Sequence, residues 1–147
     1  MMIYETEKSN EIMETLISLS EAWETENNCY GYRANRKEDI EENRVFLAAE
    51  NGEVLGYLFG KIYPAKNMNS IIPENTPYFE VEELYVIPSH RSKGIGAALF
   101  RYAEDALRRD ARYIVLSTAS KNWKAVFHFY LDELGMNFWS ARLFKEI

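Results

Sequence analysis

The stretch Val81–Ala97, VEELYVIPSHRSKGIGA, decides the fold of this chain. Its pattern predicts a β-strand, a proline stop, a basic turn and the glycine-rich start of a helix. Backbone N–H groups at a helix start lack intrahelical partners and carry partial positive charge, so they can hold a phosphate. Gly94 and Gly96 allow a ligand to approach the backbone closely, and Arg91 and Lys93 add full positive charge. The stretch therefore predicts a site for a phosphorylated ligand.

Two common phosphate-binding loops do not fit this stretch. The Walker pattern needs four residues between its first glycine and a Gly-Lys pair followed by Ser or Thr, and no such segment is present. The dinucleotide fingerprint needs a third small residue where Leu99 stands and an acidic residue about 20 positions further on, where Ile114 and Val115 lie. The pattern that remains is Arg-x-x-Gly-x-Gly over Arg91–Gly96. It resembles the coenzyme A pyrophosphate loop of the GNAT acyltransferase superfamily.

A second motif extends the resemblance toward the C-terminus. The line Asn122-x-x-Ala125-x-x-x-Phe129-Tyr130, followed by Leu134-Gly135-Met136, is similar to the next motif of the superfamily. The periodicity predicts an amphipathic helix after the glycines, a strand over Tyr113–Thr118, a helix from about Asn122 to Gly135 and a closing strand over Phe138–Phe144. Strand, helix, strand, helix, strand is the order of the ligand-binding half of the superfamily. The resemblance covers Val45 to the C-terminus well and the earlier segment only loosely.

The segment before the phosphate loop predicts the rest of one sheet. The expected elements are a strand over Ile3–Thr6, a helix over Asn10–Ala22 capped by Ser9 or Asn10, a short polar helix over Lys37–Asn43, strands over Val45–Ala49 and Val54–Ile62 around an Asn51-Gly52 turn, a flexible loop or extended hairpin tip over Pro64–Pro77, and a strand over Phe79–Val86. These elements fit one domain over residues 1–147. Its expected class is α/β (α+β), a GNAT-like mixed, mainly antiparallel central sheet flanked by helices.

The composition excludes several classes of protein. Hydrophobic residues make up 47% and charged residues 27% of 147 residues, which is typical of a soluble globular domain. No apolar run reaches the roughly 20 residues of a membrane span, and the N-terminus lacks the pattern of a secretory signal. The net charge of −6 argues against nucleic-acid binding and suits a cationic substrate. Because a single cysteine allows no internal disulfide, we expect a cytoplasmic protein.

Three glutamates on the strand before the loop are candidate general bases. Transfer of an acyl group to an amine requires a base that accepts a proton from the ammonium, whose pKa is about 10.4 for a lysine-like amine. On a regular strand, Glu80, Glu82, Leu84 and Val86 share one face, and Val81, Glu83 and Tyr85 share the other. The resemblance assigns the base to Glu80, with Glu82 as the second candidate. The alternative is that these carboxylates only keep the edge of the sheet solvated.

The resemblance also implies the other site residues. Tyr130 would protonate the leaving thiolate. The alternative interpretation is a tyrosine that packs in the core with its hydroxyl hydrogen-bonded. The backbone of Leu84, Tyr85 and Val86 would pair with the pantetheine arm, and an N–H group there would meet the thioester oxygen. The expected contacts of the diphosphate are Arg91, Ser92, Lys93, Gly94, Ile95, Gly96 and Ala97. Asn122 would cap its helix and contact the coenzyme, although a plain N-cap needs no function.

Other chemistry-bearing residues give weak signals. His90 and His128 have no metal-ligand spacing around them, so no metal is expected. Cys29 has no visible base beside it and is interpreted as a bystander thiol. The aromatic residues Trp23, Tyr30 and Tyr32, with Glu24 and Glu26 nearby, predict either an acceptor pocket for an aromatic or cationic amine or simple hydrophobic packing.

The sequence therefore predicts an N-acyltransferase that uses acetyl-CoA as co-substrate and a small-molecule or peptide amine as acceptor. The resemblance implies direct attack within a ternary complex, without a covalent enzyme intermediate. The alternative is a catalytically silent coenzyme A-binding module with a regulatory or sensor role. Exposed strand edges and the aromatic C-terminus are compatible with a homodimer. No nucleic acid and no membrane are expected as partners.

Overall fold

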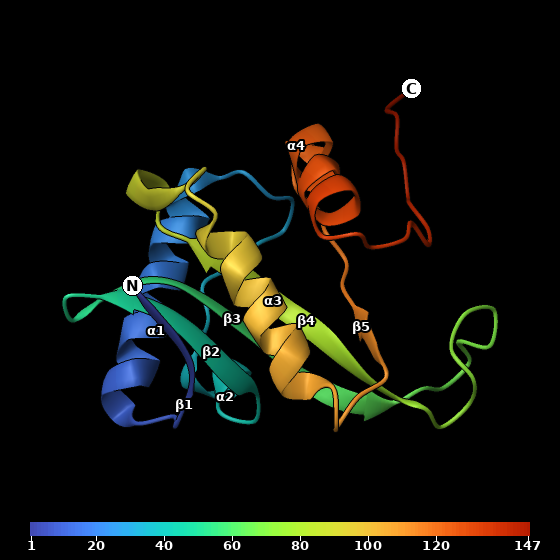
Figure 1. Cartoon of the computed structure of the whole chain (residues 1–147). Helices are drawn as coiled ribbons and strands as arrows, with labels where there is room; N and C mark the ends of the chain where they lie inside the picture. The colour runs from blue at the N-terminus through green and yellow to red at the C-terminus, as the bar shows by residue number, and fades with distance from the viewer.

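A five-stranded sheet forms the centre of the computed structural model, which describes residues 1–147 (Figure 1). The strands follow in sequence order: β1 (Met2–Thr6), β2 (Arg44–Glu50), β3 (Glu53–Pro64), β4 (Pro77–Val86) and β5 (Tyr113–Val115). The pairs β1–β2, β2–β3 and β3–β4 are antiparallel, whereas β5 runs parallel to β4. The expected mixed, mainly antiparallel sheet is confirmed.

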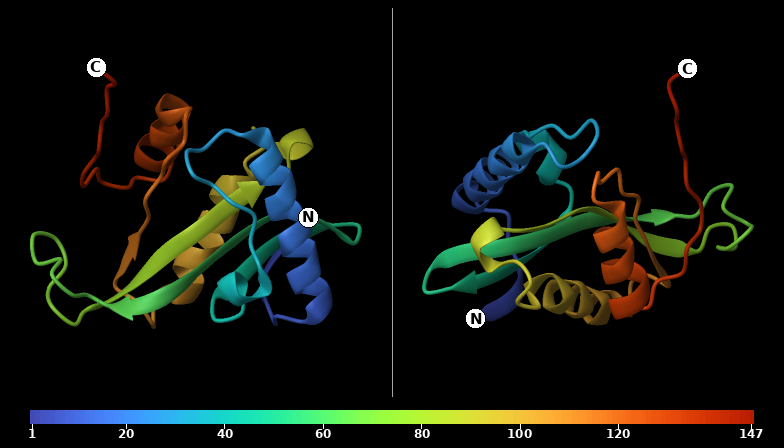
Figure 2. Two further views of the ribbon diagram at one scale, coloured as in Figure 1. Left: turned by 180° about the vertical axis from the view of Figure 1, so that it is seen from behind. Right: turned by 90° about the horizontal axis from the view of Figure 1, so that it is seen from above.

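Helices cover both faces of the sheet. They are α1 (Asn10–Glu26), α2 (Lys37–Ile40), α3 (Ile95–Leu107) and α4 (Trp123–Phe127), with a 3₁₀ turn over Pro88–His90 and a π-helical stretch over His128–Glu133. Seen from above, α1 and α2 lie on one side of the sheet and α3 and α4 on the other (Figure 2). None of the helices is both long enough and apolar enough to cross a membrane.

Local sequence signals set several element boundaries. The hydroxyl of Ser9 accepts a hydrogen bond from the N–H of Ile12 at 3.2 Å, which confirms Ser9 as the cap of α1. Asn51 and Gly52 both have positive φ, 51° and 79°, as a tight hairpin turn between β2 and β3 requires. The loop after β3 closes on itself through N–H groups of Ala65 and Asn75, so it forms an ordered extension of the hairpin.

Two apolar clusters hold the layers together. The first joins the sheet to α3 and includes Phe46, Leu58, Phe79 and Leu99, all at most 1% exposed. The second joins the other face to α1 and α2 and is formed by Met13, Leu16, Ile40, Val45, Leu47, Tyr57, Phe59 and Tyr85. Strand β4 contributes to both clusters, so its two faces are fixed by packing on each side.

A bulge in β4 overturns the expected distribution of its side chains. Glu83 pairs with Phe59 and Val81 pairs with Gly60, so Glu82 is an extra residue without a partner on β3. The α3 face therefore carries Phe79, Val81, Leu84 and Val86. The opposite face carries Glu80, Glu83 and Tyr85. The prediction that Glu80 shares a face with Leu84 and Val86 is wrong, because the inserted residue reverses the alternation.

The C-terminal segment departs most from the predictions. Strand β5 ends at Val115 rather than at Thr118, and the last helix changes from α to π geometry at His128. The expected closing strand over Phe138–Phe144 does not form, and the backbone of residues 137–147 makes no hydrogen bond. In Figures 1 and 2 this segment runs away from the sheet after α4.

Candidate active site

The free edge of β4 lies between β5 and the start of α3. Pairing with β5 involves only Tyr78–Glu80, so from Val81 to Val86 β4 has a hydrogen-bonding neighbour only on the β3 side. The expected contacts Leu84, Tyr85 and Val86 all belong to this stretch. An extended ligand that carries amide groups can pair with such an edge like an additional strand. One acceptor there is already used, because Nε of Arg91 donates to the carbonyl of Val86 at 2.8 Å.

The N-terminus of α3 follows directly after this edge. Gly94 occupies the N-cap position with φ of 83°, a conformation that favours glycine, and no side chain caps the helix. The N–H groups of Ile95, Gly96 and Ala97 therefore have no acceptor in the protein, whereas the N–H of Ala98 bonds to the carbonyl of Gly94. Three free donors and the positive end of a 13-residue helix suit an anion.

The side chains of the loop differ in their availability. Ser92 and Lys93 are exposed beside the helix start. Arg91 does not present a free charge: its guanidinium holds the Glu26 carboxylate with two hydrogen bonds, of 2.6 and 2.9 Å. Glu26 also accepts a hydrogen bond from the hydroxyl of Tyr85 at 2.7 Å, and Arg91 lies 5.2 Å above the Tyr85 ring. In this structure Arg91 fastens the loop to α1.

The pKa of the Glu26 carboxylate depends on these partners. Burial by itself would raise the pKa of Glu26, but hydrogen bonds from Arg91 and Tyr85 and the nearby positive charge hold the pKa below its ordinary value. The pair therefore stays ionised at neutral pH. Local sequence patterns do not predict this contact, because 65 residues separate Glu26 from Arg91.

Glu80 lies in the middle of β4, between Lys61 of β3 and Val115 of β5. Its carboxylate makes no hydrogen bond and no ion pair, since Lys61 is paired with Glu42 instead at 2.8 Å. Burial, together with the negative charge of Glu82, raises the pKa of Glu80 to about 7. A half-buried carboxylate with that pKa and no partner has the properties of a general base near neutral pH.

Glu83 has the opposite environment. Its carboxylate accepts hydrogen bonds from the hydroxyls of Tyr57 (2.8 Å) and Tyr32 (3.0 Å) and from Nδ2 of Asn35 (2.9 Å). Burial raises the pKa of Glu83, and these hydrogen bonds oppose the rise. Because its oxygens are occupied, Glu83 fixes the loop after α1 to the sheet rather than remaining free for proton transfer.

Tyr130 lies on the π-helical stretch against α3. Its ring contacts Phe100 and Phe129, with centroid distances of 6.3 and 4.9 Å, and its hydroxyl has no hydrogen-bond partner in the protein. Burial, followed by the charge of Cys29, raises the pKa of Tyr130 to about 12. A Cβ on Gly96 would lie 3.3 Å from the Phe129 ring, so Gly96 allows this helix to approach the phosphate loop. No ring contact or hydrogen bond joins Tyr130 to Glu80.

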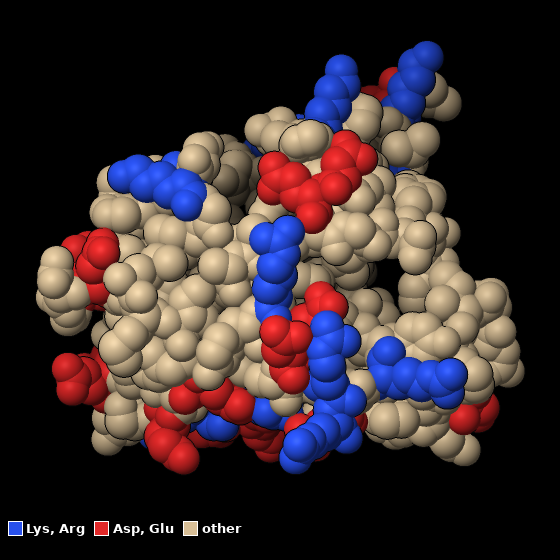
Figure 3. All heavy atoms as spheres, viewed as in Figure 1, with Lys and Arg blue, Asp and Glu red and all other residues tan.

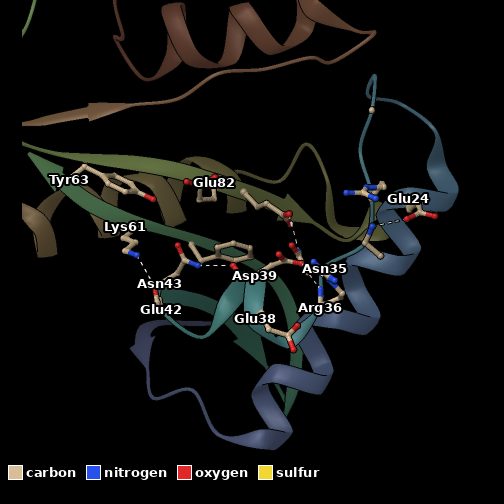
Figure 4. Close-up of a pocket in the computed structure, with 15 residues that line it drawn as sticks. Glu24, Asn35, Arg36, Glu38, Asp39, Glu42, Asn43, Lys61, Tyr63 and Glu82 are labelled. Atoms are coloured by element: carbon tan, nitrogen blue, oxygen red, sulfur yellow. Dashed lines mark hydrogen bonds and ion pairs between the residues drawn. The ribbon is translucent and has the colours of Figure 1, made fainter. Parts of the chain in front are cut away.

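An acidic cavity opens on the α1 and α2 side of the sheet, next to β4 (Figure 4). It has a volume of about 910 Å³ and is lined by three basic residues, Arg33, Arg36 and Lys61, and by six acidic residues, Glu24, Glu38, Asp39, Glu42, Glu82 and Glu83. Several of the carboxylates are engaged, as Glu24 is with the N–H of Ala34. Glu82 projects into the cavity from the bulge of β4 and makes no hydrogen bond. The bulge thus places Glu82, one of the two candidate bases, beside the cavity, whereas Glu80 does not line it.

The aromatic group anticipated for an acceptor pocket is divided by the fold. Trp23 stacks on both Tyr32 and Tyr85, at centroid distances of 4.2 and 5.1 Å, and is a partly buried side chain packed against the second apolar cluster. Tyr30 lies outside this stack, at the edge of Phe144. Glu24 lines the acidic cavity. Glu38, Asp39 and Glu42, on and around α2, were not predicted to line it, because only the fold brings them to β4.

The remaining candidates have limited roles in this structure. Asn122 stands at the N-cap position of α4, but its side chain makes no capping hydrogen bond, so the expected cap is wrong. His90 contacts only Ser89, at 2.9 Å. Burial raises the pKa of the Cys29 thiol, which keeps it protonated and unreactive. No group of three or more histidine, cysteine or acidic residues is arranged to hold a metal ion.

Known proteins share both the sequence pattern and the fold of this chain. The model of the acetyltransferase (GNAT) family matches residues 10–136. Over 85 residues the chain is 33% identical to YhfO, an uncharacterized N-acetyltransferase of Bacillus subtilis strain 168. This match covers 57% of the chain and 53% of the relative, so the chain spans about half the length of that protein.

Two solved structures extend the similarity to the whole chain. Aminoglycoside N-acetyltransferase AAC(6')-Iy in complex with CoA superposes with a TM-score of 0.69 and 16% identity, over 99% of this chain and 98% of that one. Ribosomal-protein-alanine N-acetyltransferase from Brucella melitensis gives 0.68 and 17%, over 99% and 100%. At this level of identity the likeness establishes the fold.

Proposed function

The chain belongs to the acetyltransferase (GNAT) family, and from this premise we propose that it transfers an acetyl group from acetyl-CoA to a primary amine by direct attack within a ternary complex. Membership makes the chain an acyltransferase enzyme of the N-acetyltransferase type. One observation carries the finer proposal: the free edge of β4 leads directly to three unpartnered N–H groups at the start of α3. The strand edge can pair with the amide groups of an extended arm, and the N–H groups can hold a diphosphate, so a ligand that carries both would fit.

The chain's own residues fit coenzyme A. The N–H groups of Ile95, Gly96 and Ala97 would hold the diphosphate, with Lys93 adding positive charge. The backbone of Leu84 and Tyr85 would pair with the pantetheine amides. Coenzyme A supplies the acetyl thioester and a thiolate leaving group. A free N–H on β4 would donate to the thioester oxygen as it becomes negative.

Glu80 is proposed as the general base. Its pKa of about 7 lets the carboxylate accept a proton from the acceptor ammonium, directly or through a water molecule. Glu82 lines the acidic cavity, is exposed and acts on Glu80 through its negative charge, so it would orient the cationic amine. The lone pair of the neutral amine can then attack the acetyl carbonyl.

Tyr130 is proposed as the group that stabilises and protonates the departing thiolate. Its hydroxyl has no other hydrogen-bond partner, so it is free to donate. With a pKa of about 12, the phenol stays protonated throughout the neutral range. The pH dependence of the rate should therefore report Glu80 and not Tyr130.

The acidic cavity is proposed as the acceptor site. Six carboxylates against three basic side chains favour a cationic amine over a neutral or anionic molecule. Small polyamines, aminoglycoside-like compounds and peptide amines all meet this description. We also infer a cytoplasmic setting, because the chain has one cysteine and no disulfide to stabilise it outside a reducing compartment.

The test is release of free thiol from acetyl-CoA with a broad panel of amines. We expect turnover with at least one cationic amine and a rise of kcat/KM with pH that has its midpoint near 7. Glu80→Gln should lower kcat by about 10²–10⁴-fold and abolish this rise, and Tyr130→Phe should lower kcat by about 10²-fold. Glu53→Gln, in the exposed β2–β3 hairpin, is the matched control and should leave the rate unchanged.

A thermal-shift measurement with acetyl-CoA separates the alternatives. A shift without turnover on any amine would identify a catalytically silent coenzyme A-binding module, and the transfer proposal would be wrong. The absence of both a shift and turnover would contradict coenzyme binding itself.

A further inference from the structure

Lys61 and Glu80 lie directly opposite each other on neighbouring strands of the sheet. They are register partners in the antiparallel pair of β3 and β4, so both side chains project from the same face. Residues in this position have Cβ atoms about 4.5–5.5 Å apart, and opposite charges there stabilise the pairing of the strands. The ladder therefore places a cation within reach of the carboxylate that is proposed as the general base.

The Lys61 ammonium nevertheless contacts a different carboxylate. Its Nζ lies 2.8 Å from Oε2 of Glu42, which follows the short helix α2, and no ion pair joins Lys61 to Glu80. Figure 4 shows the Lys61 side chain pointing from β3 toward Glu42, with a dashed line at this contact. Glu80 is thus left without a counter-ion, although a lysine stands on the adjacent strand.

Opposite charges that lie close together elsewhere on the molecule do form pairs. In the same sheet, Arg44 of β2 pairs with Glu5 of the adjacent strand β1 at 2.8 Å. Figure 3 shows basic and acidic side chains lying next to one another on the face of the molecule that α3 covers. The separation of Lys61 from its cross-strand partner therefore requires a competing carboxylate, and Glu42 supplies it.

Lys61 is the only cation of the strands β3, β4 and β5. The other titratable groups beside Glu80 on these strands are Tyr63, Tyr78, Glu82 and Tyr113. The charged residues on the α2 side are Arg33, Arg36, Glu38, Asp39 and Glu42, which line the cavity that Glu80 does not line. Burial and the charge of Glu82 raise the pKa of Glu80 to about 7, and a contact with Lys61 would lower this pKa.

We propose that Glu42 is a positioning residue for the acetyl transfer: it holds the Lys61 ammonium away from Glu80, so that the base keeps no counter-ion. This inference rests on the proposed role of Glu80. A carboxylate without a bound cation accepts a proton from the acceptor ammonium more readily than one paired with a lysine. The Glu42 side chain is 74% exposed, and because exposed ion pairs are weak, removal of this one partner is enough to release Lys61.

The released ammonium has two possible partners on β4, and both have the same consequence. In contact with Glu80, Lys61 lowers the pKa of that carboxyl directly. In contact with Glu82, it cancels the negative charge that helps to raise the pKa of Glu80. Glu42→Gln should therefore lower the pKa of Glu80 from about 7 to about 6.

An NMR titration of the Glu80 side-chain carboxyl carbon on the full chain tests the proposal, with the signal assigned by its loss in Glu80→Gln. We expect a midpoint near pH 7 in the wild type and about one pH unit lower in Glu42→Gln. The double variant Glu42→Gln with Lys61→Gln should return to the wild-type midpoint, because no ammonium is left to move. Glu41→Gln removes the same charge from the exposed neighbouring residue and is the matched control, which should titrate as the wild type does.

The pH profile of kcat/KM should shift in the same order, which a purely structural role of Glu42 would not produce. An unchanged midpoint in Glu42→Gln would overturn the inference, and so would a lowered midpoint that persists in the double variant. A wild-type midpoint near the ordinary glutamate value of about 4.3 would overturn it as well. Because the NMR titration needs no acceptor amine, it separates failure of this inference from failure of the proposed acetyl transfer, which thiol release measures.

Discussion

Residues 1–107 and residues 108–147 differ in how deeply their side chains are buried and in what packs against them. Every buried residue lies between Met13 and Leu107, and none lies in the last forty residues. The first region has two apolar clusters on either side of four long strands. The second region has one three-residue strand, a short helix with irregular geometry and a chain of aromatic edge contacts.

This difference assigns a different role to each region. The first region contains the apolar core and presents the parts that need fixed geometry, namely Glu80, the edge of β4 and the start of α3. The second region supplies Tyr130 and the C-terminal segment over residues 137–147, and its large apolar side chains are mostly exposed. We therefore expect the first region to determine stability and the second to gain order on binding.

Apolar truncation should give the largest contrast between the regions. Phe79→Ala removes a fully buried ring from the α3 cluster and should cost about 3–5 kcal/mol in the free energy of unfolding. Trp123→Ala removes a ring of α4 that is 53% exposed and should cost less than about 1 kcal/mol. Urea denaturation of both variants measures the two values. Equal costs would remove the distinction between the regions.

Two glycine substitutions probe the same contrast at closer range. A Cβ on Gly56 would lie 2.7 Å from the carbonyl oxygen of Tyr85, so Gly56→Ala should cost about 1–3 kcal/mol. A Cβ on Gly96 would lie 3.3 Å from the Phe129 ring and 3.8 Å from Cγ2 of Val86, with no backbone atom that close. Because the second region can yield and alanine favours a helix, Gly96→Ala should change stability by less than about 0.5 kcal/mol. Thermal unfolding of the two variants checks this order, and a larger loss for Gly96→Ala would contradict it.

The ion pair between Glu26 and Arg91 should have a smaller effect. Glu26→Gln keeps the shape of the side chain but loses the charge that holds the phosphate loop to α1. We expect a loss of about 1 kcal/mol, reduced by solvent screening of this partly exposed pair, and weaker binding of coenzyme A by several-fold. Glu21→Gln, exposed on the same helix, is the control. Calorimetric titration that shows unchanged affinity for Glu26→Gln would indicate that the pair does not position the loop.

The pH dependence of stability tests the environment of one carboxylate of the first region. The pKa of Glu80 is raised to about 7 in the folded chain, so folding disfavours its ionised form. The folded chain holds this proton between about pH 4.3 and 7 while the unfolded chain releases it, and stability falls as pH rises through that window. Relative to wild type, Glu80→Gln should therefore gain in Tm as pH increases from 5 to 8. A Tm difference that does not vary with pH would contradict the raised pKa.

Sequence patterns predicted the elements whose signals are local. The strand, glycine loop and helix around Gly94, the Ser9 cap and the Asn51-Gly52 turn each depend on neighbours within a few residues. The family resemblance, confirmed by the family match, rests on the same kind of signal. These features define the first region and its site.

Features that depend on distant partners were not predicted. The bulge at Glu82 arises from register against β3, and it changed which face carries Glu80. The Arg91–Glu26 pair and the acidic cavity join segments far apart in the chain. The aromatic-rich pattern over Phe138–Phe144 predicted a closing strand that does not form, because a pattern cannot show whether the chain provides an edge to receive it.

Amide hydrogen exchange with and without acetyl-CoA tests the central claim most directly. The N–H groups of Ile95, Gly96 and Ala97 have no acceptor in the protein, so they should exchange rapidly in the free chain. On addition of acetyl-CoA they should become strongly protected, together with amides on the free edge of β4 between Val81 and Val86. Protection that appears elsewhere while these amides still exchange rapidly would contradict the account.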